Sequence, residues 1–135
     1  MKIVKAFVAV SALWAYAQIS QSADENGRFW LGGGAGGVKC PQFVASMEKA
    51  RSLGIGSLGY AEATQGFTMY LLGFKTGYNM STQDTCDIFP GEEKDYPLLS
   101  WAENYCRSNP SSRFADAVVV LAKERHPKRQ RVCSK

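Results

Sequence analysis

Hydrophobic residues recur at helical spacing from Cys40 onward and predict two helices in the first half of the chain. The first is expected to begin at Cys40, with Pro41 in its first turn, and to end at Gly54. The second is expected over about residues 61–80. Each has one apolar face, which consists of Phe43, Val44, Met47 and Ala50 in the first helix and of Phe67, Tyr70, Leu71, Phe74 and Tyr78 in the second.

The second half of the chain predicts two more helices. The third is expected over residues 96–108, and the fourth follows a cap at Ser111 or Ser112 and ends before Pro127. Their apolar faces are Leu98, Trp101, Ala102 and Tyr105 in the third helix and Phe114, Ala117, Val118 and Leu121 in the fourth. No segment alternates with the period of two that is typical of strands. We therefore predict an all-α fold, a small four-helix bundle that forms one domain over residues 38–135.

These apolar faces also predict the side chains that form the core. A helix of a small bundle buries its apolar stripe against its neighbours, so the larger members of each stripe are expected to be buried. The predicted core consists of Phe43, Met47, Phe67, Tyr70, Phe74, Leu98, Trp101, Tyr105, Phe114, Val118 and Leu121.

The second helix carries three glycines, Gly66, Gly73 and Gly77, on roughly one side. Each glycine in an exposed helix interior costs around 1 kcal/mol relative to alanine. A stripe of this kind favours a helix in which another chain segment packs closely against the glycines. The alternative is a frayed or kinked helix.

The N-terminal region is typical of an exported protein. Lys2 and Lys5 precede an apolar run over residues 6–17, which is the pattern of a secretory signal peptide. The run is shorter than the roughly twenty apolar residues that cross a bilayer. We expect residues 1–23 to be cleaved, which leaves no membrane span, and the alternative is an uncleaved anchor. Residues 24–37 combine charge with a run of glycines and predict a flexible linker.

Four cysteines remain after cleavage, and their number and context predict disulfides. They are Cys40, Cys86, Cys106 and Cys133. An even count in an exported chain indicates two disulfides, for which three connectivities are open. None of the spacings is CxxC, so a zinc ribbon or a redox-active pair is not indicated.

The charge pattern does not indicate nucleic-acid binding. The whole chain has a net charge of +4, and loss of Lys2 and Lys5 with the signal peptide leaves +2. Residues 84–95 form an acidic loop, and residues 123–135 form a basic tail. The tail could contact anionic lipid or an acidic partner, and the alternative is a solvated tail held by Cys133.

Enzymatic and cofactor motifs are weak in this sequence. Two segments, residues 32–37 and 54–59, match GxGxxG, but neither lies between a predicted strand and helix, as dinucleotide binding requires. The only histidine, His126, lies at the end of a predicted helix, where it serves as a favourable charge. The acidic loop lacks the ligand spacing of a calcium site. We therefore predict no catalytic residue, no metal ligands and no cofactor, and a hydrolase or other enzyme is a minor alternative.

Four short segments resemble a known family. They are KCPQFV at residues 39–44, LGFKTGYN at 72–79, NYC at 104–106 and RFADAV at 113–118. Their order and content resemble the HdeA family of small helical periplasmic acid-stress chaperones over about residues 38–126. That family ties a cysteine before its first helix to one in its third. The resemblance therefore implies a disulfide between Cys40 and Cys106.

A second resemblance overlaps the first. Residues 73–78, TCD at residues 85–87, the segment from NYC to Asn109-Pro110, the 114–121 helix and a closing cysteine are similar to Rap/Tai immunity proteins of type VI secretion. Those proteins bind and block periplasmic toxins. This resemblance implies a disulfide between Cys86 and Cys133. The basic tail departs from both families, and the toxin-plugging residues of the immunity proteins have no counterpart that can be placed here.

The two resemblances lead to one class of function with two alternatives. We expect a non-enzymatic periplasmic protein-binding module, HdeA-like, that acts as an acid-stress chaperone, and the alternative is an immunity protein. Its expected partners are unfolded periplasmic proteins or one protein toxin, with a second copy of the chain as a further option. The expected protein-binding residues are Phe67, Tyr70, Phe74, Tyr78, Trp101 and Tyr105.

Overall fold

The computed structural model describes residues 33–91 and 96–133, which contain four α-helices. The helices are α1 (Cys40–Ser52), α2 (Leu58–Ser81), α3 (Tyr96–Ser108) and α4 (Phe114–Arg125), with the short 3-10 helices η1 (Gly34–Gly37) and η2 (His126–Lys128). Within the described ranges there is no strand, and isolated antiparallel bridges join Lys39 to Arg113 and Asp87 to Gln130. The fold is therefore all-α, as predicted. The predicted signal peptide lies outside the described residues.

Local interactions explain where the helices begin and end. Gly54, which follows α1, has a φ of 90°, a conformation that favours glycine and stops the helix. The second helix begins earlier than predicted because the Ser57 hydroxyl caps it, accepting a hydrogen bond from the Tyr60 amide at 3.0 Å. The predicted cap of the fourth helix at Ser111 or Ser112 is wrong. Arg113 is the N-cap there, and its amide donates to the Asp116 carboxylate at 2.8 Å.

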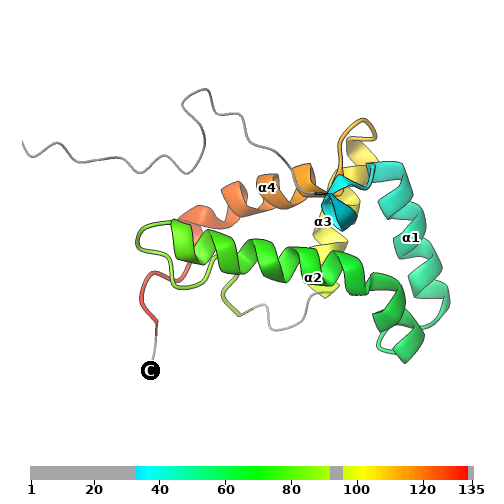
Figure 1. The fold of residues 1–135 in the computed structure, drawn as a ribbon, viewed down its shortest axis with the longest axis horizontal. Coiled ribbons are helices and arrows are strands. Elements are labelled where there is room, and N and C mark those ends of the chain that lie inside the picture. The colour runs from blue at the N-terminus through cyan, green and yellow to red at the C-terminus, as the bar shows by residue number, and fades with distance from the viewer. Residues whose placement is uncertain (1–32, 92–95, 134–135) are drawn as a thin grey trace, which may run out of the picture.

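The helices pack in a chain of pairs (Figure 1). α1 packs against both α2 and α3, and α3 packs against α4. α2 and α4 run side by side in the same direction, because Tyr70 meets Phe114 at the start of α4 and Tyr78 meets His126 at its end. The aromatic side chains of α2 therefore lie along the junction with α4.

Three phenylalanine rings from three helices form the centre of the core. Phe43 of α1 lies 4.7 Å from Phe67 of α2 and 4.5 Å from Phe114 of α4, measured between ring centroids. Seven of the predicted core residues are buried, namely Phe43, Met47, Phe67, Leu98, Phe114, Val118 and Leu121. The other four, Tyr70, Phe74, Trp101 and Tyr105, are half-buried and pack against the core.

The predicted linker is wrong at its C-terminal end. Residues 34–37 form η1, in which Gly36 is buried. A Cβ atom at Gly36 would overlap the ring of Tyr70, so only glycine allows this close approach to α2. The folded domain therefore begins before residue 38. The earlier part of the predicted linker lies outside the described residues.

Both disulfides have the pairing implied by the resemblances. Cys40 and Cys106 join the start of α1 to α3 with their Cα atoms 4.8 Å apart. Cys86 and Cys133 join the loop after α2 to the C-terminal segment with a Cα separation of 5.3 Å. Since all four cysteines are paired, no thiol is free. None of the helices in the described ranges has the length and apolar character needed to span a membrane.

Candidate protein-binding surface

Of the six predicted binding residues, Phe67 is the one that the closed structure keeps inside. Its side chain is buried between Phe43 and Phe114, and its centroid lies 5.1 Å from that of Phe114. The other five are half-buried and pack on the core from its edge. Phe67 can therefore contact a partner only if the helices separate.

Three of the half-buried residues form a row along α2 beside α4. The Tyr70 ring lies 5.7 Å from Phe114, and burial raises the pKa of Tyr70, with a smaller contribution from the nearby Asp116 carboxylate. The ring centroids of Phe74 and Tyr78 lie 5.9 Å apart. The Tyr78 hydroxyl is 2.9 Å from His126 Nδ1, so His126 at the end of α4 forms a hydrogen bond with α2. α4 covers one side of this row.

The remaining two residues form a stacked pair on α3. The rings of Trp101 and Tyr105 lie 5.8 Å apart with an interplanar angle of 11°. At 3.6 residues per turn, this pair lies on a different side of α3 from Glu103 and Arg107. The predicted binding residues thus fall into two groups, one along the α2–α4 junction and one on α3.

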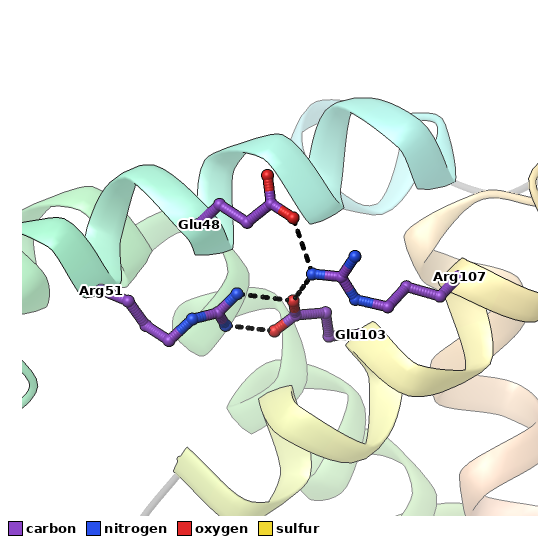
Figure 2. A network of polar contacts seen from close by, with 4 residues as sticks. All are labelled: Glu48, Arg51, Glu103 and Arg107. Carbon is purple, nitrogen blue, oxygen red and sulfur yellow. Dashed lines mark hydrogen bonds and ion pairs between the residues drawn. The ribbon is translucent and has the colours of Figure 1, made fainter.

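The contact between α1 and α3 contains a network of charged side chains (Figure 2). Arg51 Nη2 donates to Glu103 Oε1 at 2.8 Å, and Arg51 Nη1 donates to Oε2 of the same carboxylate. Arg107 Nη2 donates at 2.7 Å to Glu103 and also to Glu48. Only 6% of the Glu103 side chain is exposed, compared with 55% for Glu48. The network therefore places one buried carboxylate between two guanidinium groups.

Opposing effects act on the pKa of Glu103, and the arginines prevail. Burial alone would raise the pKa, because it disfavours the charged carboxylate. Hydrogen bonds from Arg51 and Arg107, together with their positive charges, lower the pKa below its ordinary value of 4.5. Glu103 is therefore ionised in the folded protein at neutral pH and in mild acid.

A second set of polar contacts holds the C-terminal segment to the loop after α2. We call residues 84–87 and 129–133 the C-terminal clasp. Lys75 of α2 forms an ion pair with Asp87 at 2.9 Å, and Asp87 pairs with Gln130 through the backbone. Arg129 Nε donates to the Asp84 carbonyl at 3.1 Å and to the Thr85 hydroxyl at 3.0 Å. Together with the Cys86–Cys133 disulfide, these contacts fasten both segments beside the end of α2.

Sequence reasoning missed an apolar surface on the outside of α2. We call Gly66, Met69, Leu72, Gly73, Gly77 and Met80 the outer α2 face. Met69 is 62% exposed, Met80 is 84% exposed and Leu72 is 41% exposed. A Cβ atom at Gly73 or Gly77 would meet no atom within 4 Å, so no segment among the described residues packs closely against these two glycines, contrary to the prediction. Exposed apolar area of this kind is typical of protein contacts.

The signal for this face was visible in the composition of α2. In 24 residues the helix carries only two charged side chains, Glu62 and Lys75, and Lys75 is paired with Asp87. A helix that is solvated on its outer side usually places charged residues there. Among the described residues, no group of three or more His, Cys, Asp or Glu side chains is arranged to hold a metal ion.

The fold and surface together define a small all-α protein with two disulfides and exposed apolar area on one helix. No protein-family model, curated protein or solved structure matches the chain. The resemblances to the HdeA family and to the Rap/Tai immunity proteins therefore remain predictions.

Proposed function

We propose that this protein is a non-enzymatic protein-binding module of the periplasm, HdeA-like, which binds unfolded proteins after acid loosens its packing. The observation that carries the proposal is the two groups of aromatic side chains, one on α2 and one on α3, that are half-buried at the edge of the core. Two disulfides support an oxidising compartment outside the cytoplasm. The predicted signal peptide agrees with export to the periplasm.

Acid acts on two ion pairs that hold parts of the fold together. Glu103 holds α3 to α1 through Arg51, and Asp87 holds the C-terminal clasp to α2 through Lys75. Protonation of a carboxylate removes its ion pair and leaves the positive partner without compensation. Acid therefore weakens both attachments.

The net positive charge that the chain gains in acid adds to this loss of stability. After loss of Lys2 and Lys5 the chain has 14 Lys and Arg, 12 Asp and Glu and one His. Full protonation of the carboxylates and His126 changes the side-chain charge from +2 to +15, which is strong self-repulsion in a small fold. The disulfides do not titrate, so Cys40–Cys106 still joins α1 to α3 when the ion pairs are lost. The opened chain would remain compact with its aromatic faces exposed.

The test is suppression of aggregation. The mature, disulfide-intact protein is mixed with an aggregation-prone client, and light scattering is followed at pH 2.5 and at pH 7. We expect suppression at pH 2.5 only. Phe74→Ser and Trp101→Ser should each weaken it, whereas Val132→Ser, at a residue that is 78% exposed in the C-terminal clasp, should leave it unchanged. An absence of suppression at both pH values would reject the chaperone function.

A specific inhibitor of a toxin, of the Rap/Tai kind, is the second candidate. The observation that favours it is the outer α2 face, which is exposed in the closed structure and needs no acid to become available. Affinity capture from periplasmic extract at neutral and acid pH distinguishes the two functions. One stoichiometric partner at pH 7 supports the inhibitor, and many partners in acid alone support the chaperone.

A further inference from the structure

Positive charge is concentrated at one end of the molecule. Residues 123–133 contain five Lys and Arg and one Glu, which is a net charge of +4, whereas the chain after loss of residues 1–23 has +2. The rest of that chain is therefore net negative. Residues 123–133 comprise the end of α4, η2 and the C-terminal segment, and they lie at the opposite end of α2 from α1 (Figure 1).

Four of these cations keep their charge uncompensated. We call Lys123, Lys128, Arg129 and Arg131 the basic end. Within the described ranges none of the four forms an ion pair with a carboxylate. Arg129 donates to two backbone carbonyls and to a threonine hydroxyl, which are neutral groups, and the other three side chains are exposed. Asp84 and Glu124 add two exposed carboxylates to this region, which leaves an excess of positive charge.

The segment that carries Arg129 and Arg131 is held in place, unlike a solvated tail. Gln130 exchanges backbone hydrogen bonds with Asp87 at 2.8 and 3.1 Å, and its carbonyl also accepts from the Cys86 amide at 2.8 Å. The Cys86–Cys133 disulfide closes the same segment at its end. A flexible tail loses conformational entropy when it binds a partner, whereas a segment that is already ordered loses less. The cations are therefore presented as a preformed surface.

Exposed apolar residues lie next to these charges in the chain. Val132 directly follows Arg131, and its side chain is 78% exposed. Pro127 directly precedes Lys128 and is exposed as well. Basic residues beside exposed apolar side chains are typical of segments that lie on an anionic membrane surface, where the cations meet headgroup phosphates and the apolar groups meet the acyl boundary. An acidic protein segment would satisfy the cations alone.

We infer that the basic end binds the surface of a membrane that contains anionic lipid, with its four cations against the headgroup phosphates and Val132 at the acyl boundary. Each Lys or Arg close to such a surface strengthens binding about fivefold. The attraction is electrostatic and is therefore weakened by salt. Lys and Arg are charged at neutral pH, so this binding needs no acid. The inference does not depend on the proposed chaperone or inhibitor function.

Cosedimentation of the mature, disulfide-intact protein with vesicles at pH 7 tests the inference. The vesicles contain phosphatidylcholine alone or phosphatidylcholine with about 30% phosphatidylglycerol, each at low and at physiological salt. We expect binding to the anionic vesicles at low salt, binding to the neutral vesicles that is weaker by about tenfold or more, and a loss of binding as salt rises. Equal binding to both kinds of vesicle, or no binding to either, overturns the inference.

A matched pair of double variants assigns the binding to the basic end. Lys128→Gln with Arg131→Gln removes two of its charges and should weaken binding to the anionic vesicles about tenfold or more. Lys39→Gln with Lys49→Gln removes the same net charge at exposed positions at the start of α1 and within it, and should change binding by no more than about twofold. Far-ultraviolet circular dichroism checks that both variants are folded. Equal weakening by the two would show that net charge alone governs binding and would reject a role of the basic end.

Soluble poly-glutamate distinguishes lipid from an acidic protein as the partner. It is added to the protein and the anionic vesicles at equal concentrations of negative charge. We expect most of the protein to remain with the vesicles, because poly-glutamate offers no apolar boundary to Val132. A complex with poly-glutamate that forms while no protein sediments with the vesicles would indicate an acidic protein partner and overturn the assignment to lipid.

Discussion

Glu103 is a carboxylate at the α1–α3 contact with only 6% of its side chain exposed. We expect Glu103→Gln to lower the free energy of unfolding at neutral pH by about 1.5–3 kcal/mol, because hydrogen bonds between a charged pair are lost at a buried site. Glu48→Gln removes an exposed partner of the same network and should cost less than about 1 kcal/mol. Urea denaturation of both variants at pH 7 measures the difference.

The pH dependence of this effect has a definite sign. Folding lowers the pKa of Glu103 below 4.5. The ionised carboxylate therefore stabilises the folded protein fully at pH values above the pKa of Glu103 in the unfolded chain. This stabilisation is lost as the pH falls through the lower pKa of Glu103 in the folded protein. The stability of the native protein should therefore approach that of Glu103→Gln as pH falls below about 4. A difference between the two proteins that persists unchanged at pH 2 would contradict the assigned role of Glu103.

At the scale of elements, the two disulfides differ in their surroundings. Cys40 and Cys106 are buried in the core, whereas Cys133 is exposed and Cys86 is half-buried in the C-terminal clasp. Since thiol–disulfide exchange requires access to sulfur, we expect a limited dose of reductant to open Cys86–Cys133 first. Alkylation of trapped thiols followed by peptide mapping over time measures the order. Simultaneous labelling of all four cysteines would contradict it.

The disulfides also differ in what they hold together. Loss of Cys86–Cys133 through paired serine substitutions should release the C-terminal segment from the loop after α2, while Cys40–Cys106 still ties α1 to α3. The two disulfides thus join different pairs of segments, α1 to α3 in one case and the loop after α2 to the C-terminal segment in the other.

For the whole molecule, we expect acid to open the tertiary packing between about pH 4 and 2, where carboxylates with ordinary pKa values are protonated. Near-ultraviolet circular dichroism should lose its aromatic signal while most of the far-ultraviolet helical signal remains. Added salt should shift the midpoint to lower pH, because it screens repulsion among the positive charges. An aromatic signal that is unchanged at pH 2 would exclude acid opening.

The sequence by itself determined the helices and most of the core. Apolar residues at helical spacing mark the face of each helix, and seven of eleven predicted core residues are buried. The even cysteine count indicated two disulfides, although their pairing came from resemblance. These features depend on local periodicity and residue type, which are readable along the chain.

Only the tertiary structure decided the long-range contacts. Ile88 and Phe89 are buried although they lie in the loop after α2, outside any helical face, and Arg51 reaches Glu103 across 52 residues. The exposure of Met69 and Met80 beside Gly73 and Gly77 likewise follows from the packing, in which none of the described segments covers them. Each of these contacts depends on how separate helices and loops pack in space, which the spacing of residues along one helix does not specify.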